Sequence, residues 1–376
     1  MKIGILTLPL HRNYGGILQA YALQTILQRM GHGVVVFNKD RFLHFSLFRQ
    51  MLSFSKYCIR SIFTSHKVKY ISPREYNEQL WLREQNLMTF IKNDIKTINV
   101  KHLNSDVPDD IDAIVVGSDQ VWRRPYFMSL YSTKIENAFL EFLQSKNIIR
   151  LAYAASFGTD VWEYSDDETQ RCASLLKLFD AVSVRENSGV QLCENKLGRT
   201  DVECLLDPTM LLTKEDYIRL VVDSNTAKSK GNLLCYILDN NDAKQSLINK
   251  IASERNLNAF RIFASLKEKD GKDSEPLPSI AQWLRGFLDS EFVITDSFHA
   301  CVFSIIFNKP FLVIGNRERG IARFETLLST FSLTKNMIFD VTDYDSTYGY
   351  NVRPQVNDLL EKERYKSMQF LKRYLN

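Results

Sequence analysis

The stretch IGILTLPLHRNYGGILQAYALQTILQRMGHGVVVF, residues 3–37, decides the fold class. The apolar run at 3–8 is typical of a buried strand, and PLHRNYGG at 9–16 is typical of a turn that contains glycine. From residue 17 apolar side chains recur at helical spacing, and Gly31 stands where a helix C-terminus is expected. VVVF at 34–37 predicts a second, parallel strand, so the stretch predicts a βαβ unit.

Strands and helices continue to alternate on either side of a turn at Asp207-Pro208. Before the turn we expect strands at 112–116, 151–155, 181–184 and 203–206. After it we expect strands at 233–238, 259–263, 291–295 and 311–314, and helices at 242–255, 279–289, 299–308 and 322–331. The pattern predicts two Rossmann-like domains, residues 1–208 and 209–345, followed by a closing helix within 355–376.

Composition agrees with a folded, water-soluble protein of two domains. The chain has 376 residues, 45% of them hydrophobic and 24% charged, with a net charge of +4, which excludes disordered, collagen-like and coiled-coil proteins. The six cysteines form no CxxC pair, so neither a zinc site nor a disulfide framework is predicted. The apolar stretch at 3–10 is too short for a signal peptide or a membrane span, and we expect a cytoplasmic protein.

One segment departs from the even charge balance. Residues 41–74 contain seven Lys or Arg and no Asp or Glu, interleaved with aromatic and aliphatic side chains. A helical lid with a solvated basic face is one interpretation of this basic aromatic insertion. The other is peripheral contact with an anionic membrane, at the inner face of which the protein would then lie.

Ligands of open α/β sheets bind beyond the carboxyl ends of the strands, so the loops after the strands are the candidate sites. Gly15 and Gly16 would let the backbone approach a ligand at a helix N-terminus, although a tight turn alone also needs glycine. The segment GSDQVW at 117–122 combines polar groups with Trp122, a composition suited to sugar hydroxyls. The candidate ligand-binding residues of these two loops are Asn13, Tyr14, Gly15, Gly16, Ser118, Asp119 and Gln120.

Histidine and arginine follow later strands. His299, preceded by the candidate N-caps Asp296 and Ser297, stands at the first turn of an apolar helix and is the best catalytic candidate. A buried histidine that only bonds to a carbonyl is the alternative. Arg185 follows the strand at 181–184, and Arg317 and Arg319 lie in a loop where they could bind phosphate or carboxylate, or pair with Glu318.

Other classes of site are not indicated. The six histidines have no HxxxH or HxH spacing, so no metal site is predicted, and there is no P-loop. The basic insertion lacks the base-stacking pattern of an RNA-binding sheet, so no nucleic-acid partner is expected.

The ordered set of motifs resembles the polysaccharide pyruvyl transferase family from residue 3 to about 330. The set comprises the opening stretch, GSDQVW, AASFG (154–158), SVREN (183–187), LLDPTML (205–211), TDSFHACVFSIIFNKPFLVI (295–314) and RGIARFETLL (319–328). The resemblance implies a GT-B-like fold in which two Rossmann-like domains with parallel sheets face a cleft. It also implies a cytoplasmic transferase of surface polysaccharide biosynthesis, with phosphoenolpyruvate as co-substrate, no further cofactor, and a saccharide acceptor, lipid-linked or free.

Carried over residue by residue, the family's histidine falls on His299 as general acid/base and its first-domain arginine on Arg185. The donor-holding basic residue falls near Arg319, with Arg317 as the close alternative, and Asp296 and Ser297 belong to the same donor side. Where the best-studied members have Arg-Leu-His, this chain has Ser297-Phe298-His299. Either Arg317 or Arg323 replaces the missing charge, or the donor differs.

Two other functions share this sequence pattern. A GT-B glycosyltransferase would use a nucleotide sugar in the same cleft, and a nucleotide rather than phosphoenolpyruvate would then stabilise it. A non-catalytic saccharide-binding protein would not need His299 beside clustered arginines. The acceptor sugar, the ketal geometry and the oligomeric state are left open.

Overall fold

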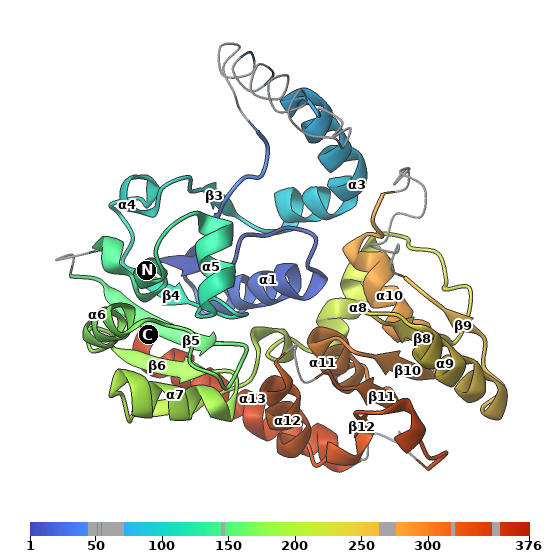
Figure 1. Ribbon diagram of the computed structural model, residues 1–376. Helices are drawn as coiled ribbons and strands as arrows, with labels where there is room; N and C mark the ends of the chain where they lie inside the picture. Colours follow the sequence, from blue (N-terminus) through green and yellow to red (C-terminus); the bar gives the residue numbers. More distant parts are fainter. Residues whose placement is uncertain are drawn as a thin grey trace, which may run out of the picture.

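The computed structural model describes residues 1–43, 51, 54, 71–143, 147–262, 276–316, 320–347 and 354–376. Within these ranges the chain forms two parallel sheets with helices around them (Figure 1). This architecture confirms the predicted α/β fold class of two Rossmann-like units.

The N-terminal sheet has, within the described ranges, seven strands in the order β3-β2-β1-β4-β5-β6-β7, all parallel. Its strands are β1 (Lys2–Leu6), β2 (Gly33–Asn38), β3 (Thr97–Asn99), β4 (Ala113–Val116), β5 (Ile149–Ala155), β6 (Ala181–Val184) and β7 (Val202–Cys204). The helices between them are α1 (Tyr14–Arg29), α3 (Pro73–Asp94), α4 (Leu103–Asp106), α5 (Arg124–Tyr131), α6 (Asp166–Leu176) and α7 (Asn187–Leu197).

The C-terminal sheet has, in the same described part of the chain, five parallel strands in the order β12-β11-β10-β8-β9. They are β8 (Leu233–Tyr236), β9 (Ala259–Phe260), β10 (Phe292–Thr295), β11 (Phe311–Ile314) and β12 (Met337–Ile338). Their helices are α8 (Lys214–Asp223), α9 (Asp242–Glu254), α10 (Ile280–Asp289), α11 (Phe298–Ile306) and α12 (Ile321–Thr330), and α13 (Pro354–Leu375) ends the chain.

The stretch that opens the chain folds as its pattern predicts. β1 pairs with β2 in parallel register, and α1 connects them. α1 begins at Tyr14, three residues before the expected start, because the two glycines lie inside its first turn. Gly31, at φ 91°, follows the C-cap Met30 and adopts the left-handed conformation common just after a helix.

Several strand ends differ from the sequence prediction. β7 stops at Cys204 and β9 is two residues long, whereas the apolar runs extend to 206 and 263. β3 and β12 were not predicted, because edge strands of two or three residues carry no recognisable alternation. α11 is buried at every position, which confirms the prediction of a buried helix at 299–308.

The two sheets meet along α1, α10 and α11, whose apolar side chains share one core. Tyr14 of α1 stacks on Trp283 of α10 at 5.6 Å between ring centroids. α13 returns from the C-terminal sheet to the N-terminal one, where the Ser367 hydroxyl accepts a hydrogen bond from the Leu206 N–H (Figure 1). The segment between β7 and α8, which contains Asp207, therefore lies at the junction of both units.

The basic aromatic insertion, the domain boundaries and the membrane prediction concern the periphery of the molecule. Most of the basic aromatic insertion lies outside the described residues, so its role stays a prediction, as do the domain boundaries at 208 and 345. Among the described residues, no helix combines the length and the apolar character that crossing a membrane requires.

Candidate active site at the junction of the two sheets

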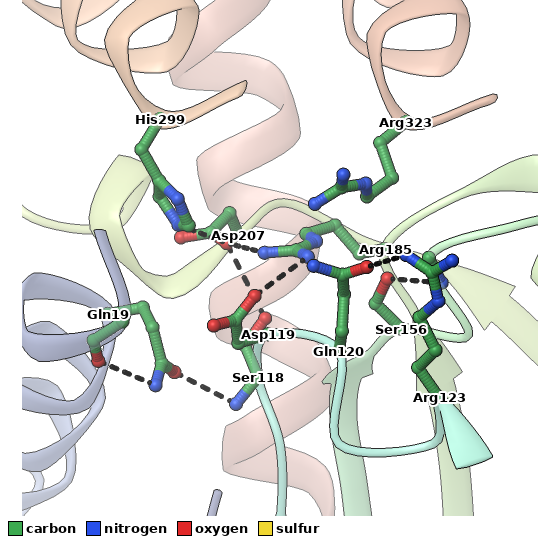
Figure 2. Close-up of polar contacts among 12 residues, drawn as sticks. Gln19, Ser118, Asp119, Gln120, Arg123, Ser156, Arg185, Asp207, His299 and Arg323 are labelled. Atoms are coloured by element: carbon green, nitrogen blue, oxygen red, sulfur yellow. Dashed lines mark hydrogen bonds and ion pairs between the residues drawn. The ribbon is translucent and has the colours of Figure 1, made fainter. Parts of the chain in front are cut away.

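A buried cluster of charged side chains lies where the two sheets meet (Figure 2). Its members follow strands of both sheets or lie between them: Asp119 after β4, Arg185 after β6, Asp207 in the connecting segment, His299 on α11 and Arg323 on α12. All five are more than nine-tenths buried. Parallel strands bring their carboxyl ends to one edge of a sheet, which is why these distant residues come together.

Arg185 occupies the centre of the cluster. Its guanidinium donates to the Asp207 carboxylate at 2.7 Å and to the Asp119 carboxylate at 3.3 Å. Both ion pairs are almost completely buried. Burial alone would lower the pKa of Arg185, but Asp207 and Asp119 raise it, so the side chain is a fixed cation.

Asp207 connects the arginine, the histidine and the segment between the sheets. Its Oδ1 accepts hydrogen bonds from the backbone N–H and the hydroxyl of Thr209, at 3.0 and 2.7 Å. Its Oδ2 accepts from Arg185 and lies 3.6 Å from Nε2 of His299. Burial would raise the pKa of Asp207, but His299 and Arg185 hold it well below the usual range, so this carboxylate stays ionised.

His299 is held between Asp207 and the backbone of α1. Its Nε2 faces the carboxylate and has no hydrogen-bond partner within the described part of the chain. A Cβ on Gly15 would lie 2.0 Å from both Cγ and Nδ1 of the imidazole. Gly15 is therefore required because the histidine ring occupies the place of a side chain. The alternative of a histidine bonded only to a carbonyl is not supported at Nε2.

Phe298 brings a second arginine to the cluster. The Arg185 guanidinium lies 4.7 Å, and that of Arg323 5.4 Å, from the centroid of its ring. Arg323 points from α12 toward Arg185 and Gln120 (Figure 2). Burial and the charge of Arg185 lower the pKa of Arg323 to about 10. Phe298 thus brings the guanidinium groups of Arg185 and Arg323 to one ring.

Glu186 fixes the loop that borders the arginines. Its Oε1 accepts hydrogen bonds from the Ser156 hydroxyl and from the N–H groups of Phe157 and Gly158. A Cβ on Gly320 would lie 2.0 Å from the Gly158 carbonyl oxygen, so this loop of the first sheet closely approaches the start of α12. Glu186 thus holds the loop that meets the start of α12 beside Arg323.

The structure corrects the interpretation of GSDQVW as an open sugar site. The Ser118 N–H donates to Gln19 and its hydroxyl donates to the Ala154 carbonyl, so both polar groups are satisfied internally. Trp122 is fully buried and stacks on Phe139, which removes it from any ligand. Asp119 pairs with Arg185, while Gln120 accepts from Arg123 at 3.2 Å near the cluster (Figure 2).

The loop before α1 is corrected in part. Asn13 donates to Asp119 at 3.2 Å and so joins the cluster. The Gly16 carbonyl accepts from Gln19, and what closely approaches the backbone at Gly15 is His299, not an open ligand space. Tyr14 is buried, and its hydroxyl donates to the Pro278 carbonyl at 2.7 Å. It therefore stabilises the junction with α10 and does not face the cluster.

The donor-side predictions have different outcomes. Asp296 accepts from the N–H groups of Leu238 and Asp239 and from the Lys244 ammonium, so it holds the loop after β8 and is not a cap. Ser297 occupies the N-cap position of α11 without a side-chain capping bond. Arg317 and Arg319 lie outside the described residues, and their role stays a prediction.

Sequence reasoning overlooked Asp207 and Glu186 and mentioned Arg323 only as a substitute charge. Asp207 carries a weak sequence signal, since an Asp-Pro pair separates the two alternating patterns. Glu186 lies directly after Arg185, yet nothing in the sequence shows that its carboxylate binds a loop 30 residues earlier.

Two further features complete the geometry. A cavity of about 40 Å³ borders Arg185, Asp207 and Phe298 on the side of α13, which is room for a water molecule. No group of three or more histidine, cysteine or acidic side chains in the described ranges is arranged to hold a metal ion.

Comparison with known proteins gives one family. A family model described as polysaccharide pyruvyl transferase matches residues 13–318. No curated protein matches the chain. The match to the family model includes all members of the buried cluster except Arg323, which lies five residues after the end of the match.

Solved structures that the chain matches over most of its length are similar to it only at low identity. Arabidopsis thaliana UGT89C1 complexed with UDP-L-rhamnose is 10% identical, covers 98% of this chain and 94% of its own, and has a TM-score of 0.49. UDP-GlcNAc 2-epimerase from Methanocaldococcus jannaschii, in complex with UDP-GlcNAc and UDP, is 12% identical over 100% and 99%, with a TM-score of 0.45. The corresponding epimerase from Neisseria meningitidis, bound to UDP-GlcNAc, is 9% identical over 100% and 93%, with a TM-score of 0.44.

Proposed function

Because the chain belongs to the polysaccharide pyruvyl transferase family, we propose that it transfers the pyruvyl group of phosphoenolpyruvate to two hydroxyls of a saccharide. The family membership makes the protein a transferase that acts in polysaccharide biosynthesis. The donor and the residues that act on it are our inference from the buried cluster.

The observation that carries the donor proposal is the pair of arginines on Phe298. Phosphoenolpyruvate has a phosphate and a carboxylate, which need more than one fixed cation. Arg185 and Arg323 supply two guanidinium groups on the same ring. Burial first, and the charge of Arg185 second, lower the pKa of Arg323, and a bound anion would counteract both effects. In this proposal Arg323 supplies the positive charge that other family members carry on an arginine at the position of Ser297. Arg317 and Arg319 contribute further positive charge for the donor.

His299 is the proposed general acid/base. In the reaction one saccharide hydroxyl attacks C2 of the donor, the methylene carbon receives a proton to become a methyl group, and inorganic phosphate leaves. The second hydroxyl bonds to the same carbon and closes the ketal. Of the two hydroxyl protons, one balances the proton gained by the methylene carbon and the other leaves with the phosphate. A single imidazole can deliver and accept these protons.

Asp207 positions the catalytic groups. Its Oδ2 lies between the Arg185 guanidinium and Nε2 of His299, so one carboxylate orients both side chains. The Thr209 bonds to Oδ1 fix the carboxylate in turn. Such preorganised charges stabilise a departing phosphate without further reorganisation. The proposed reaction uses no metal and no cofactor beyond the donor.

The wider setting is also a proposal. We infer a bacterial-type surface polysaccharide pathway at the cytoplasmic side, with a lipid-linked acceptor held near an anionic membrane by the basic aromatic insertion. Seven cations without a carboxylate support this placement. An oligomeric form is compatible with it.

The test is a pair of measurements on the full chain. Millimolar phosphoenolpyruvate should raise the melting temperature beyond a sulfate control, because a ligand of the native state stabilises it. Mass spectrometry of saccharides incubated with protein and donor should detect the added pyruvyl mass. The matched variant is Arg323→Met, which should retain the fold and lose most of the shift.

Two results would contradict the donor assignment. One is a melting shift with a nucleoside diphosphate and none with phosphoenolpyruvate, which would favour a nucleotide-sugar glycosyltransferase. The other is an unchanged phosphoenolpyruvate shift in Arg323→Met, which would place the donor elsewhere.

A further inference from the structure

A cavity of about 740 Å³ lies beside the N-terminal sheet, apart from the buried cluster. Its walls come from the loop after β1, the loop after β2, the inner side of α3 and the start of β3. The volume is within the range of small-molecule sites. Nothing in the proposed chemistry of the cluster uses this space.

The loops after β1 and β2 that line the cavity leave the sheet at the same edge as the candidate active site. His11 lines it, and Gly15, four residues further along, contacts His299. Four residues of extended chain span at most about 14 Å. The Leu10 N–H donates to Asn38 at 2.8 Å, which ties the loops after β1 and β2 together. The cavity wall at His11 therefore lies within about 14 Å of the residue that contacts His299, a distance that a molecule of a few sugar units spans.

The wall of the cavity combines aromatic and amide side chains, as saccharide-binding sites do. Trp81 and Phe42 contribute aromatic surface, and Trp81 is 48% exposed although it is large and apolar. Asn38, Asn93 and Asn99 add amide groups to the lining. Aromatic faces stack on the apolar faces of sugar rings while amides bond to hydroxyls.

The charges of the wall are unbalanced. The lining has four cations, Lys39, Arg41, Lys92 and Lys96, against two carboxylates, Asp40 and Glu84. Arg41 is paired with the buried Glu84 at 2.9 Å. The Lys39 ammonium donates to the Tyr131 carbonyl at 2.6 Å.

Lys92 and Lys96 are both exposed, and neither forms an ion pair with another residue of the described ranges. His11 adds no charge near neutral pH, because burial and Arg41 lower its pKa to about 4. The two lysines therefore present a positive rim beside a neutral imidazole that can bond to a hydroxyl.

We propose that this cavity binds the part of the saccharide acceptor remote from the reacting hydroxyls, and that this part carries a phosphate or a carboxylate. Trp81 stacks on a sugar ring, and Lys92 with Lys96 binds the anionic group. This assignment rests on the proposed transfer to a saccharide, but it concerns recognition and can fail separately from the chemistry.

The experiment is calorimetric titration of the full chain without phosphoenolpyruvate. The probes are hexose 1-phosphates, hexuronic acids and methyl hexosides of the gluco, galacto and manno series, together with inorganic phosphate. At least one anionic hexose should bind at least tenfold tighter than its methyl hexoside and than phosphate alone. Binding of a hexose 1-phosphate, of a hexuronic acid or of both identifies the anionic group.

The variants locate the binding in the cavity. Trp81→Ala and the double variant Lys92→Gln/Lys96→Gln should each weaken it tenfold or more. Leu82→Ala, the exposed neighbour outside the lining, and Lys362→Gln/Lys372→Gln on α13 should stay within twofold.

Three outcomes overturn the proposal. They are equal binding of neutral and anionic hexoses, unchanged binding in the cavity variants, and no binding of any anionic hexose. Each leaves the donor experiments on Arg323 unaffected, so the proposed function is judged independently.

Discussion

The buried cluster and the α3 cavity, which is lined by residues that include His11, Asn38, Phe42, Trp81, Glu84, Lys92, Asn93, Ile95 and Lys96, place charge in opposite surroundings. In the cluster, Arg185, Asp207 and Asp119 are buried. The Arg185 guanidinium lies 2.7 Å from the Asp207 carboxylate and 3.3 Å from the Asp119 carboxylate. In the cavity, Lys92 and Lys96 are exposed. A charge that is buried must be paired and fixed, whereas an exposed charge costs little to hold and can select a ligand. The contrast supports the two proposals, of chemistry in the first region and of recognition in the second.

The largest expected effect is the loss of Arg185. Arg185→Met leaves Asp207 and Asp119 buried without their cation, so the free energy of unfolding should fall by about 3 to 5 kcal/mol. Urea unfolding measures it. Arg124→Met, which breaks the partly exposed 2.9 Å pair with Glu168, is the matched control and should cost less than about 1 kcal/mol. Equal costs would remove the distinction between buried and exposed charge.

Next in size is the effect of His299 on turnover. His299→Asn keeps a polar side chain beside Gly15 without filling more space, but it cannot transfer a proton, so kcat should fall by about two to four orders of magnitude. The melting shift with phosphoenolpyruvate should remain. Near-normal turnover would make the histidine a structural residue of the junction.

How far the sequence determines this cluster differs from residue to residue. Arg185 and His299 each follow an apolar run, so their places at strand ends were predictable, as was the first strand, glycine turn and helix. Asp207 lies in a connecting segment, and only the approach of two separate sheets brings it to His299. The prediction of a sugar site at Ser118 and Trp122 was wrong because residues after a strand can serve the protein's own interior. The Ser118 hydroxyl bonds to the backbone, and Trp122 packs in the core.

Gly15 and Gly16 provide a matched test of the packing around His299. Both lie in the first turn of α1, where alanine is normally better than glycine. In Gly15→Ala the new Cβ would meet the imidazole at 2.0 Å and displace it, so turnover should fall about 10- to 100-fold. In Gly16→Ala it would meet the Asn13 side chain, at 2.9 Å from its amide nitrogen, and not the imidazole, so kcat should stay within about threefold. Equal kcat values would mean that the position of the ring is unimportant.

Acid should weaken the cluster through Asp207. Its pKa is lowered in the folded protein, so its contribution to stability is fully present above the unfolded pKa of about 4 and is lost as pH falls below it. The difference in unfolding free energy between the native chain and Asp207→Asn should be constant from pH 8 to about pH 5. Below about pH 4 it should shrink by on the order of 1 to 3 kcal/mol. Asp358→Asn, an exposed carboxylate on α13, is the control. A difference that grows in acid would contradict the ion-pair geometry.

The smallest expected effect belongs to the cavity lysines. Because Lys92 and Lys96 are exposed, Lys92→Gln/Lys96→Gln should change the free energy of unfolding by less than about 0.5 kcal/mol. Glu84→Gln on the same wall should cost about 1 to 3 kcal/mol, since Glu84 is buried and paired with Arg41 at 2.9 Å. Urea unfolding of both variants compares an exposed with a buried charge inside one cavity. If the lysine variant is as unstable as Glu84→Gln, its charges belong to the scaffold, and weaker saccharide binding in that variant could no longer be attributed to a lost contact.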